Sequence, residues 1–337
     1  MLNNFYQDFC EYFVYLRLKL NKLNKPKVKY NGPIFDAMGQ INSNVSGEHI
    51  IDMMNQTGVY RLALFGRYQQ EKDGRQHTID IAKKYPGQIV LGTYKRMDQR
   101  DDLTTAFVKD TMDEVRAGAK FIGELHYVHA DKQHIIEFKE KNLTGERYVN
   151  CLAPNSKILM NWLRGRNIPV MVHWENYNWE RDWPDFNKLF SEYSDVNFII
   201  PHCAYTDDAH ANEILNRHKN VYMTISKKDM FHFRKIWLNK YGDWVGRYSL
   251  KSKEKQARLE SSFLETNGKI KRDWLALLNR WQDQIMFGTD CHTIAAWEHY
   301  PEIIDVWCEI LAQVPPHICE KIAYKNAEKL YNKNESL

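Results

Sequence analysis

The sequence predicts a (β/α)8 barrel of the TIM type, and three observations support that prediction. Eight short apolar runs alternate with amphipathic segments over about 300 of the 337 residues, which indicates a parallel sheet with crossover helices. Eight is the number of parallel strands that closes into a barrel. Several runs end in a histidine or an acidic residue, as active-site strands of α/β folds do. An open, doubly wound sheet is the alternative, but no G-x-G-x-x-G turn follows the first run, where a dinucleotide-binding fold carries one.

Helix caps and chain breakers mark the boundaries of the expected elements. Ser46 offers a capping hydroxyl to the first barrel helix, and Gly58 ends that helix. The pair Pro86-Gly87 closes the next helix, and Gly118 closes the one after it. The expected strands cover residues 34–38, 59–65, 88–93, 119–123, 168–172, 196–200, 221–225 and 285–287. The expected helices cover residues 46–58, 77–85, 103–117, 156–164, 184–193, 208–217 and 318–331.

The chain divides into a barrel and two additions. Residues 1–32 hold an aromatic and aliphatic helix, residues 5–23, followed by a Lys-rich linker. We expect this helix to pack on the barrel; a helix lying on a membrane surface is the alternative. The barrel covers residues 33–332 and includes an aromatic, charged insertion at residues 229–283. The insertion is either a lid over the barrel mouth or a helical hairpin that only packs against it.

Composition excludes several classes of protein. The chain has 47 basic and 43 acidic residues, a mixed charge that does not predict nucleic-acid binding. The sequence has no apolar run of about 18 residues, so it predicts no membrane-spanning helix. The six cysteines form no C-x-x-C pair, so they indicate neither a zinc knuckle nor a disulfide scaffold and favour a cytoplasmic protein.

In a closed barrel the carboxyl ends of all strands face one mouth, so residues far apart in sequence become neighbours. The residues expected there are Met38, Gln40, Arg67, Lys95, Arg96, Glu124, His126, His173, His202, Lys227, Asp290 and His292. Imidazoles and carboxylates in one concavity suit a divalent ion such as zinc, which in catalytic sites has three protein ligands and a water. Such an ion lowers the pKa of its water toward about 7, and a nearby carboxylate can accept the proton. The remaining histidines, including His129, His134, His210, His218 and His232, are expected at the surface.

Several of these motifs resemble the amidohydrolase superfamily, in particular its amidohydrolase-related branch. The motifs are Val172-His173, Ile200-Pro201-His202, Phe287-Gly288-Thr289-Asp290 and the closing helix at residues 318–331. The resemblance covers about residues 33–332 and implies a distorted barrel with one or two divalent ions. By this resemblance His173 and His202 are metal ligands, Glu124 matches a bridging carboxylate, and Asp290 handles the proton of the attacking water.

One position departs from that pattern. The family's first strand carries a His-x-His pair that binds the more buried metal, whereas this chain has Met38-Gly39-Gln40. We therefore expect a single ion, zinc first and manganese or another divalent ion as alternatives, held by Glu124, His173 and His202. Asp290 would be the fourth ligand or the base.

The mouth also predicts the kind of substrate. Arg67, Lys95, Arg96 and Lys227 would form a positive rim that suits carboxylate or phosphate groups. Trp174 could stack on a ring, while His126 and His292 would line the same opening. The leading hypothesis is a hydrolase of a small amide, ester or lactone. The alternatives are a non-oxidative decarboxylase, which the resemblance also allows, and a metal-free ligand-binding barrel. A homodimer is compatible with the resemblance, although no interface is evident in the sequence.

Overall fold

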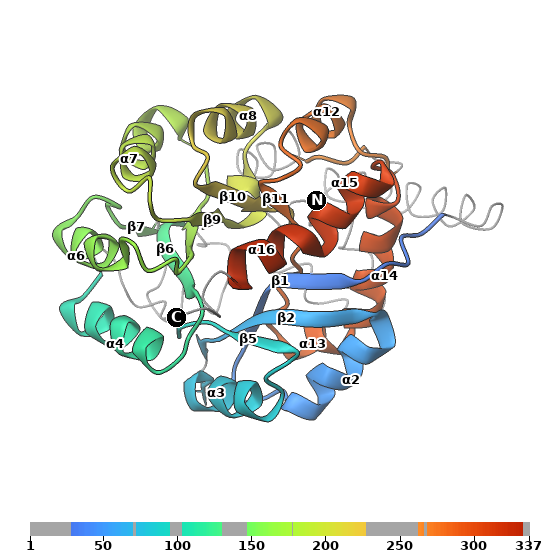
Figure 1. The fold of residues 1–337 in the computed structure, drawn as a ribbon, viewed down its shortest axis with the longest axis horizontal. Coiled ribbons are helices and arrows are strands. Elements are labelled where there is room, and N and C mark those ends of the chain that lie inside the picture. Colours follow the sequence, from blue (N-terminus) through green and yellow to red (C-terminus); the bar gives the residue numbers. More distant parts are fainter. Residues whose placement is uncertain are drawn as a thin grey trace, which may run out of the picture.

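The computed structural model describes residues 28–69, 72–94, 103–129, 147–176, 178–226, 262–265 and 268–332. In these ranges strands and helices alternate, so the predicted fold class is confirmed (Figure 1). The expected N-terminal helix, residues 5–23, and most of the expected insertion, residues 229–283, lie outside the described residues. The last part of that insertion region contains a helix, α12 (Arg272–Arg280).

Eight parallel strands form the barrel wall. In their order around the barrel they are β1 (Ile34–Ile41), β2 (Val59–Gly66), β5 (Ile89–Leu91), β6 (Ile122–His129), β8 (Val170–Trp174), β9 (Phe198–Ile200), β10 (Val221–Thr224) and β11 (Ile285–Met286). The first three strands form one hydrogen-bonded sheet, and the other five lie in a second sheet. Parallel bridges from Gly92 to Phe121 and from Gly39 to Cys291 join these sheets at both edges. The wall is therefore continuous around the barrel.

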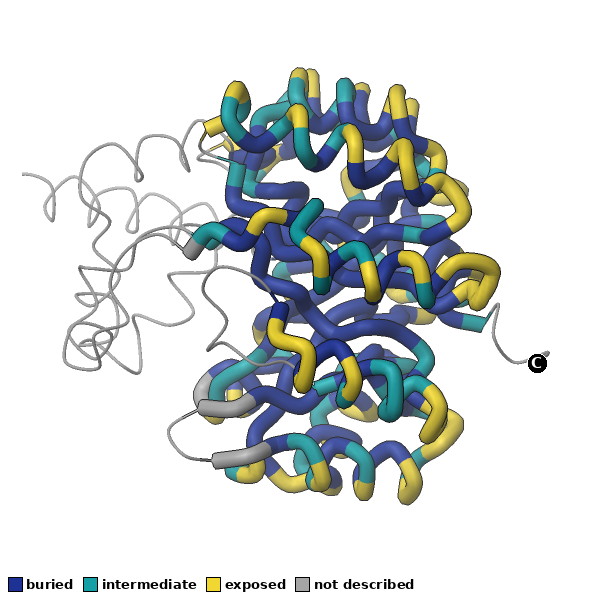
Figure 2. The backbone as a smooth tube through the Cα atoms, turned by 90° about the vertical axis from the view of Figure 1, so that its left-hand side faces the viewer, coloured by how far each residue is buried: buried dark blue, intermediate teal, exposed yellow. Residues whose placement is uncertain are grey.

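The helices cover the outside of this wall. They include α2 (Gly47–Thr57), α3 (Arg75–Lys84), α4 (Thr105–Arg116), α6 (Pro154–Leu163), α7 (Trp179–Glu192), α8 (Asp208–Arg217), α13 (Ile294–Glu298) and α14 (Tyr300–Leu311). The predicted caps of α2 are confirmed, because the Ser46 side chain accepts a hydrogen bond from His49 N and Gly58 has φ 72°. Figure 2 shows buried strands at the centre and helices that expose only their outer faces.

Several predicted boundaries differ from the structure, two of them by five residues or more. We expected the fourth strand to end at residue 123, but β6 continues to His129. Its pairing with β8 shifts register twice, between Ile122 and Leu125 and between His126 and Val128, and such bulges break the alternation of apolar residues that marks a strand in sequence. We also expected helix α7 to begin at residue 184, but Asn178 caps it and Pro184 lies within it. Helices α13 and α14 were not predicted.

The C-terminal helix closes the amino-terminal end of the barrel. It comprises α15 (Pro316–Glu320), a π-helical turn η2 (Lys321–Lys325) and α16 (Asn326–Tyr331). The π turn lets the Ile322 carbonyl accept a hydrogen bond from Phe287 N at 2.8 Å, outside the helix. Tyr331 OH donates to Ala37 O at 2.9 Å, and the ring of Tyr331 lies 5.1 Å from that of Phe121. Because aromatic side chains fill this end, polar side chains gather at the opposite one.

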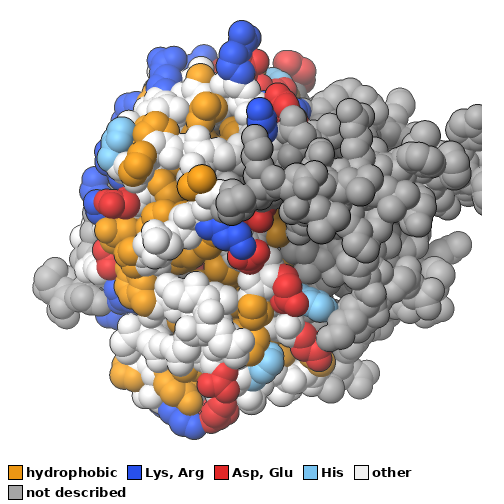
Figure 3. Space-filling view, turned by 90° about the vertical axis from the view of Figure 1, so that its right-hand side faces the viewer, with side chains coloured by type: hydrophobic (Ala, Val, Ile, Leu, Met, Phe, Trp, Pro, Cys, Tyr) orange, Lys and Arg blue, Asp and Glu red, His pale blue; other side chains and the backbone are white. Residues whose placement is uncertain are grey.

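The described surface is mixed in charge. None of the described helices combines the length and the apolar character needed to cross a bilayer. On the face drawn in Figure 3, basic, acidic and apolar side chains are interspersed. This agrees with the mixed charge of the sequence.

Candidate active site

Glu124 stands on β6 at the mouth of the barrel, and its side chain is buried, with 3% of the residue exposed. The preceding residue must be small, because a Cβ on Gly123 would lie 2.4 Å from Thr93 O on the neighbouring strand. The Glu124 carboxylate joins several groups. Its Oε1 contacts His173 Nδ1, and its Oε2 lies 3.3 Å from both His126 Nε2 and Gln40 Nε2.

His173 ends β8 between two carboxylates. Its Nδ1 faces Glu124, and its Nε2 lies 3.1 Å from Glu175 Oε1. Burial by itself would lower the pKa of His173, but Glu124 and Glu175 outweigh it and raise the pKa above its usual value. When Glu175 accepts the proton of Nε2, Nδ1 keeps a lone pair that points toward Glu124. A hydrogen bond from one ring nitrogen to a carboxylate commonly orients metal-binding histidines in this way.

His202 follows β9 in an unusual backbone conformation. His202, Cys203, Ala204 and Tyr205 all have positive φ, between 46° and 58°. Left-handed backbone costs roughly 1–2 kcal/mol for each such residue, and strain of this kind gathers at functional sites. The turn brings His202 Nδ1 to 2.8 Å from the Ser226 carbonyl oxygen. That carbonyl can only accept, so Nδ1 carries the proton and the lone pair of Nε2 faces the carboxylates.

The other nitrogen of His202 completes a set of possible ligands. His202 Nε2 lies 3.9 Å from Glu124 Oε1 and 4.0 Å from Asp290 Oδ2. Burial lowers the pKa of His202 to about 4, with the neighbouring His173 adding to this and the two carboxylates opposing it. The imidazole is therefore neutral near pH 7, which is the form that binds a metal.

Asp290 is held where β11 meets β1. It has φ 51°, and its backbone N donates to Met38 O at 2.7 Å. Gln40 Nε2 donates to Asp290 Oδ1 and, at 3.3 Å, to Glu124 Oε2. The amide therefore connects the two acids and leaves Asp290 Oδ2 toward His202.

The fully buried carboxyl group of Asp36 supports the junction between β11 and β1. Asp36 Oδ1 accepts from Met38 N at 3.1 Å and from Thr289 N at 2.8 Å, and Oδ2 accepts from Thr289 Oγ1 at 2.6 Å and Tyr300 OH at 2.9 Å. Burial raises the pKa of Asp36 to about 6, although these hydrogen bonds oppose the rise. The contacts fix the backbone on both sides of the barrel closure, one residue before Asp290.

The donor set fits a divalent ion. Glu124, His173 and His202 are all buried, and each offers a ligand atom within 4.8 Å of the others. Zinc–ligand bonds of about 2.0–2.2 Å place two ligand atoms roughly 3.3–3.6 Å apart, so Glu124 and His173, which are in direct contact, would separate, and His202 would move slightly closer to Glu124. Two of the three ligands have an outer partner, Glu175 for His173 and Ser226 for His202, that sets which nitrogen faces the group.

Several other expected residues lie at the same mouth. Arg67 is 8% exposed, and its Nη1 lies 3.5 Å from His292 O. His292 Nδ1 lies 2.9 Å from Asp290 O and 3.7 Å from Asp290 Oδ2. The His126 ring stacks on His173 at 4.5 Å. Lys95, Arg96 and Lys227, which were expected in the positive rim, lie outside the described residues.

Three expectations differ from the structure. Trp174 is 1% exposed and stacks on Phe186 at 4.2 Å, between the barrel wall and α7, because successive side chains of β8 point to opposite faces and His173 takes the inner one. It therefore packs in the core and, unlike His173, does not line the mouth. His129, expected at the surface, stacks with His126 and His173 because β6 is longer than predicted. His218 is 5% exposed and packs against Trp183 and Phe190. His134 and His232 lie outside the described residues.

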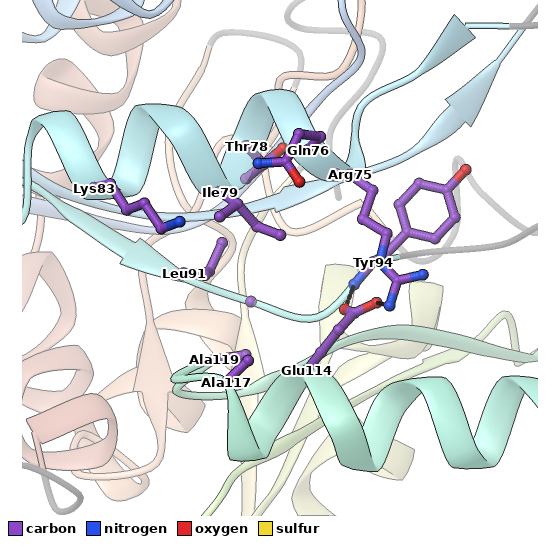
Figure 4. Close-up of a pocket in the computed structure, with 12 residues that line it drawn as sticks. Arg75, Gln76, Thr78, Ile79, Lys83, Leu91, Tyr94, Glu114, Ala117 and Ala119 are labelled. Carbon is purple, nitrogen blue, oxygen red and sulfur yellow. Dashed lines mark hydrogen bonds and ion pairs between the residues drawn. The ribbon is translucent and has the colours of Figure 1, made fainter.

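A separate pocket lies on the outside of the barrel. It has a volume of about 220 Å³ and lies between α3, the end of β5 and α4. Figure 4 shows Arg75 and Glu114 facing each other at one end of it, and their ion pair measures 2.6 Å. None of the acids and imidazoles of the mouth lines this pocket, so it is distinct from the candidate active site.

Comparison with known proteins identifies the family and supports the fold. A family model described as amidohydrolase matches residues 108–333. A search of curated proteins finds no match. Solved structures of similar fold include an uncharacterised TIM-barrel protein of Bordetella bronchiseptica, with TM-score 0.52 and 14% identity over 85% of this chain and 82% of that one.

Two further structures are assigned provisionally as 2-pyrone-4,6-dicarboxylic acid hydrolases. The one from Acinetobacter baumannii, with citric acid bound, has TM-score 0.51 and 11% identity over 89% of this chain and 100% of that one. The one from Pseudomonas putida has TM-score 0.52 and 13% identity over 89% and 97%. At these identities the likeness concerns the fold.

Proposed function

The chain belongs to the amidohydrolase family of enzymes, and from that premise we propose that it is a metal-dependent hydrolase of a small anionic amide, ester or lactone. The observation that carries the proposal is the convergence of Glu124, His173 and His202 from three separate strands. These residues, with Asp290 as fourth ligand or base, would hold one divalent ion, zinc in the first instance. Such an ion, when bound, supplies a Lewis acid for the substrate carbonyl and lowers the pKa of water.

Asp290 serves as the general base. Gln40 occupies Asp290 Oδ1 with a hydrogen bond, so Oδ2, which faces His202 and His292, is the oxygen that accepts the proton from water. The backbone bond from Asp290 N to Met38 O fixes the direction of the carboxylate. Holding the base in one orientation is a direct contribution to rate, because proton transfer requires hydrogen-bond distance.

Arg67 provides the anion preference. Its guanidinium is mostly buried beside His292, on the side of the mouth where Asp290 lies. A guanidinium in this position binds a substrate carboxylate in two-point fashion, and it would leave the reactive carbonyl to the centre of the mouth. Lys95, Arg96 and Lys227 lie outside the described residues, and their part in this preference stays a prediction from the sequence; His126 and His292 are the proposed polar contacts.

The substrate panel follows from these features. It should contain simple esters, neutral lactones and lactones with carboxylate groups, because two proteins of similar fold are assigned provisionally to a pyrone dicarboxylic acid. We expect the carboxylated lactones to react best. A substitution of Arg67 by Met should then remove the preference for the acid over its methyl ester while leaving hydrolysis of the neutral ester intact.

Metal analysis of protein purified without chelators tests the proposal. We expect about one equivalent or more of zinc or another divalent ion in the wild type, and a loss in His202→Ala. His210→Ala is the matched control, since His210 lies on α8 and contacts Asp207 and Trp179. Wild-type protein without metal, or unchanged content in His202→Ala, would contradict the mechanism.

The same preparations separate the alternatives. Release of CO2 from a carboxylated substrate would show that the enzyme is a decarboxylase instead of a hydrolase. A metal-free protein that binds the panel without turnover would be a ligand-binding barrel. The described cysteines are free thiols, which fits the reducing compartment we infer, the cytoplasm.

A further inference from the structure

A second group of potential ligands lies next to the proposed catalytic one. His126, His129 and His173 each offer a ring nitrogen, and these nitrogen atoms lie within 4.8 Å of one another. The three rings are nearly parallel, with centroids 4.5, 5.1 and 5.2 Å apart. The cluster therefore places several ring nitrogens, which borderline divalent ions prefer as ligands, next to one another.

A buried carboxylate borders the same cluster. Glu175 is 3% exposed, and its Oε1 lies 3.8 Å from His129 Nε2 and 3.1 Å from His173 Nε2. Glu124 and Asp290 are also buried, so this part of the mouth holds three buried carboxylates. Their total charge exceeds that of one divalent ion, and burying charge without compensation is costly.

We propose that His126, His129 and Glu175 bind a second divalent cation, of the borderline class that imidazole prefers, such as zinc or cobalt. His173 lies between the two groups. Its Nδ1 faces Glu124 in the first, and its Nε2 hydrogen-bonds to Glu175 in the second, so the two ions do not compete for one nitrogen. Glu175 then links the second ion to the His173 ring.

The backbone explains why both histidines reach this point. His126 lies beside His173 on the neighbouring strand, where the two residues are partners in the ladder. The register shift after His126 turns the phase of β6, so His129 comes to the same side as His126 instead of facing the helices. This location is away from β1, where Gln40 connects Glu124 and Asp290.

The location also gives the ion a route from solvent. The His129 side chain is 15% exposed, more than those of His126, His173 and Glu175, which are 5, 6 and 4% exposed. A partly exposed outer ligand allows an ion to enter and leave, so we expect this site to be the weaker of the two.

Titration of chelator-stripped protein with zinc, followed by dialysis and metal analysis, tests the inference. We expect two equivalents in the wild type and in the control His210→Ala, but one in His129→Ala. We also expect one equivalent in His202→Ala, which removes the catalytic ligand and leaves the second group. With cobalt, the difference spectrum between wild type and His129→Ala should show the visible bands of a low-coordinate ion.

The outcomes are separable from those of the proposed function. One equivalent in the wild type that persists in His129→Ala and disappears in His202→Ala would overturn the second site and leave the catalytic one. One equivalent that disappears only in His129→Ala would support the second site and overturn the catalytic one. His129→Asn keeps a polar side chain and serves in place of His129→Ala if the latter does not fold; retention of both equivalents in a folded His129 variant would also overturn the second site.

Discussion

The two halves of the barrel mouth are built from the same kind of strand end but differ in their chemistry. On the β1 side, Met38 contacts Ser226 through its sulfur and Gln40 hydrogen-bonds to both acids. On the side of β6, β8 and β9, imidazoles and carboxylates face one another. Parallel strands bring both sets to one place, but only the second set offers ligands that a divalent ion prefers.

This difference indicates that the β1 side has a supporting role. An amide N–H₂ between two carboxylates donates hydrogen bonds where a cation could otherwise lie, and it carries no charge. Asp36, on the same strand, holds the segment before Asp290 through bonds to Thr289. We infer that β1 orients the base, while β6, β8 and β9 bind the metal.

The largest expected effect comes from Asp290, which both halves contact. Asp290→Asn keeps the size and the Gln40 contact but removes the proton acceptor, so hydrolysis should fall about 10²–10⁴-fold on the best substrate of the panel. The metal content should remain, because Glu124, His173 and His202 are unchanged. A rate within about tenfold of wild type would place the base elsewhere.

The next effect concerns the support beneath the mouth. Asp36→Ala removes the acceptor of four donors, and each buried donor left without one costs about 1–3 kcal/mol, so the free energy of unfolding should fall by about 3 kcal/mol or more. Denaturant unfolding measures this change. Asp305→Ala is the control: Asp305 pairs with Lys29 but its side chain is 53% exposed, and such pairs contribute about 1 kcal/mol or less. Equal losses in the two variants would argue against the proposed support.

A substitution of Gln40 tests directly whether β1 orients the base without binding the metal. Gln40→Leu removes both donated hydrogen bonds at similar volume, so the rate should fall about tenfold, or about 1.4 kcal/mol in activation free energy, while the metal content is kept. Kinetics and metal analysis on the same sample decide this. Loss of the metal in Gln40→Leu would instead make β1 part of the metal site.

The smallest effect concerns a histidine outside both halves. Burial, together with the nearby Arg217, lowers the pKa of His218 to about 4 from its usual 6.5. Between these values the unfolded chain binds the proton more tightly, so stability is full above pH 6.5 and decreases as the pH falls toward 4. His218→Gln keeps the donor to Asn187 but does not titrate.

The comparison of His218→Gln with wild type uses urea unfolding at pH 7 and pH 5. The wild type should lose more stability than the variant, by on the order of 1–2 kcal/mol. Identical losses would mean that the folded chain protonates His218 normally. The described contacts of this ring are Asn187, Trp183 and Phe190, so the effect should not depend on added zinc, unlike any pH effect at the mouth.

Most of the fold and the candidate ligands could be predicted from the sequence, but the residues that contact those ligands could not. Apolar periodicity and caps located the eight strands, and the strand ends located Glu124, His173, His202 and Asp290. His129 was missed for a physical reason: bulges in β6 interrupt the two-residue alternation, so the strand looked finished at residue 123. Glu175 was missed because it follows the end of β8, and only coordinates show that it reaches back to His173. Trp174 was misplaced because an aromatic next to a ligand in sequence faces the other side of the strand.

The geometry of the turn at His202 and the hydrogen-bond partners of the site residues could not be predicted from the sequence either. Nothing in Pro201-His202-Cys203-Ala204-Tyr205 indicates a left-handed turn, since such residues rarely adopt positive φ. The orientation of His202 toward Ser226 depends on that turn. Likewise, Gln40 was noted as a departure from the His-x-His pair, and only coordinates show that its amide connects Glu124 and Asp290.

The most direct test of the central claim is anomalous scattering from a crystal grown without added metal. Data collected on both sides of the zinc absorption edge should give a peak between Glu124 Oε1, His173 Nδ1 and His202 Nε2, and the peak should vanish in His202→Ala. A mouth without any peak at the edge of zinc, manganese, iron or cobalt, with Gln40 and Asp290 still in contact, would contradict the account.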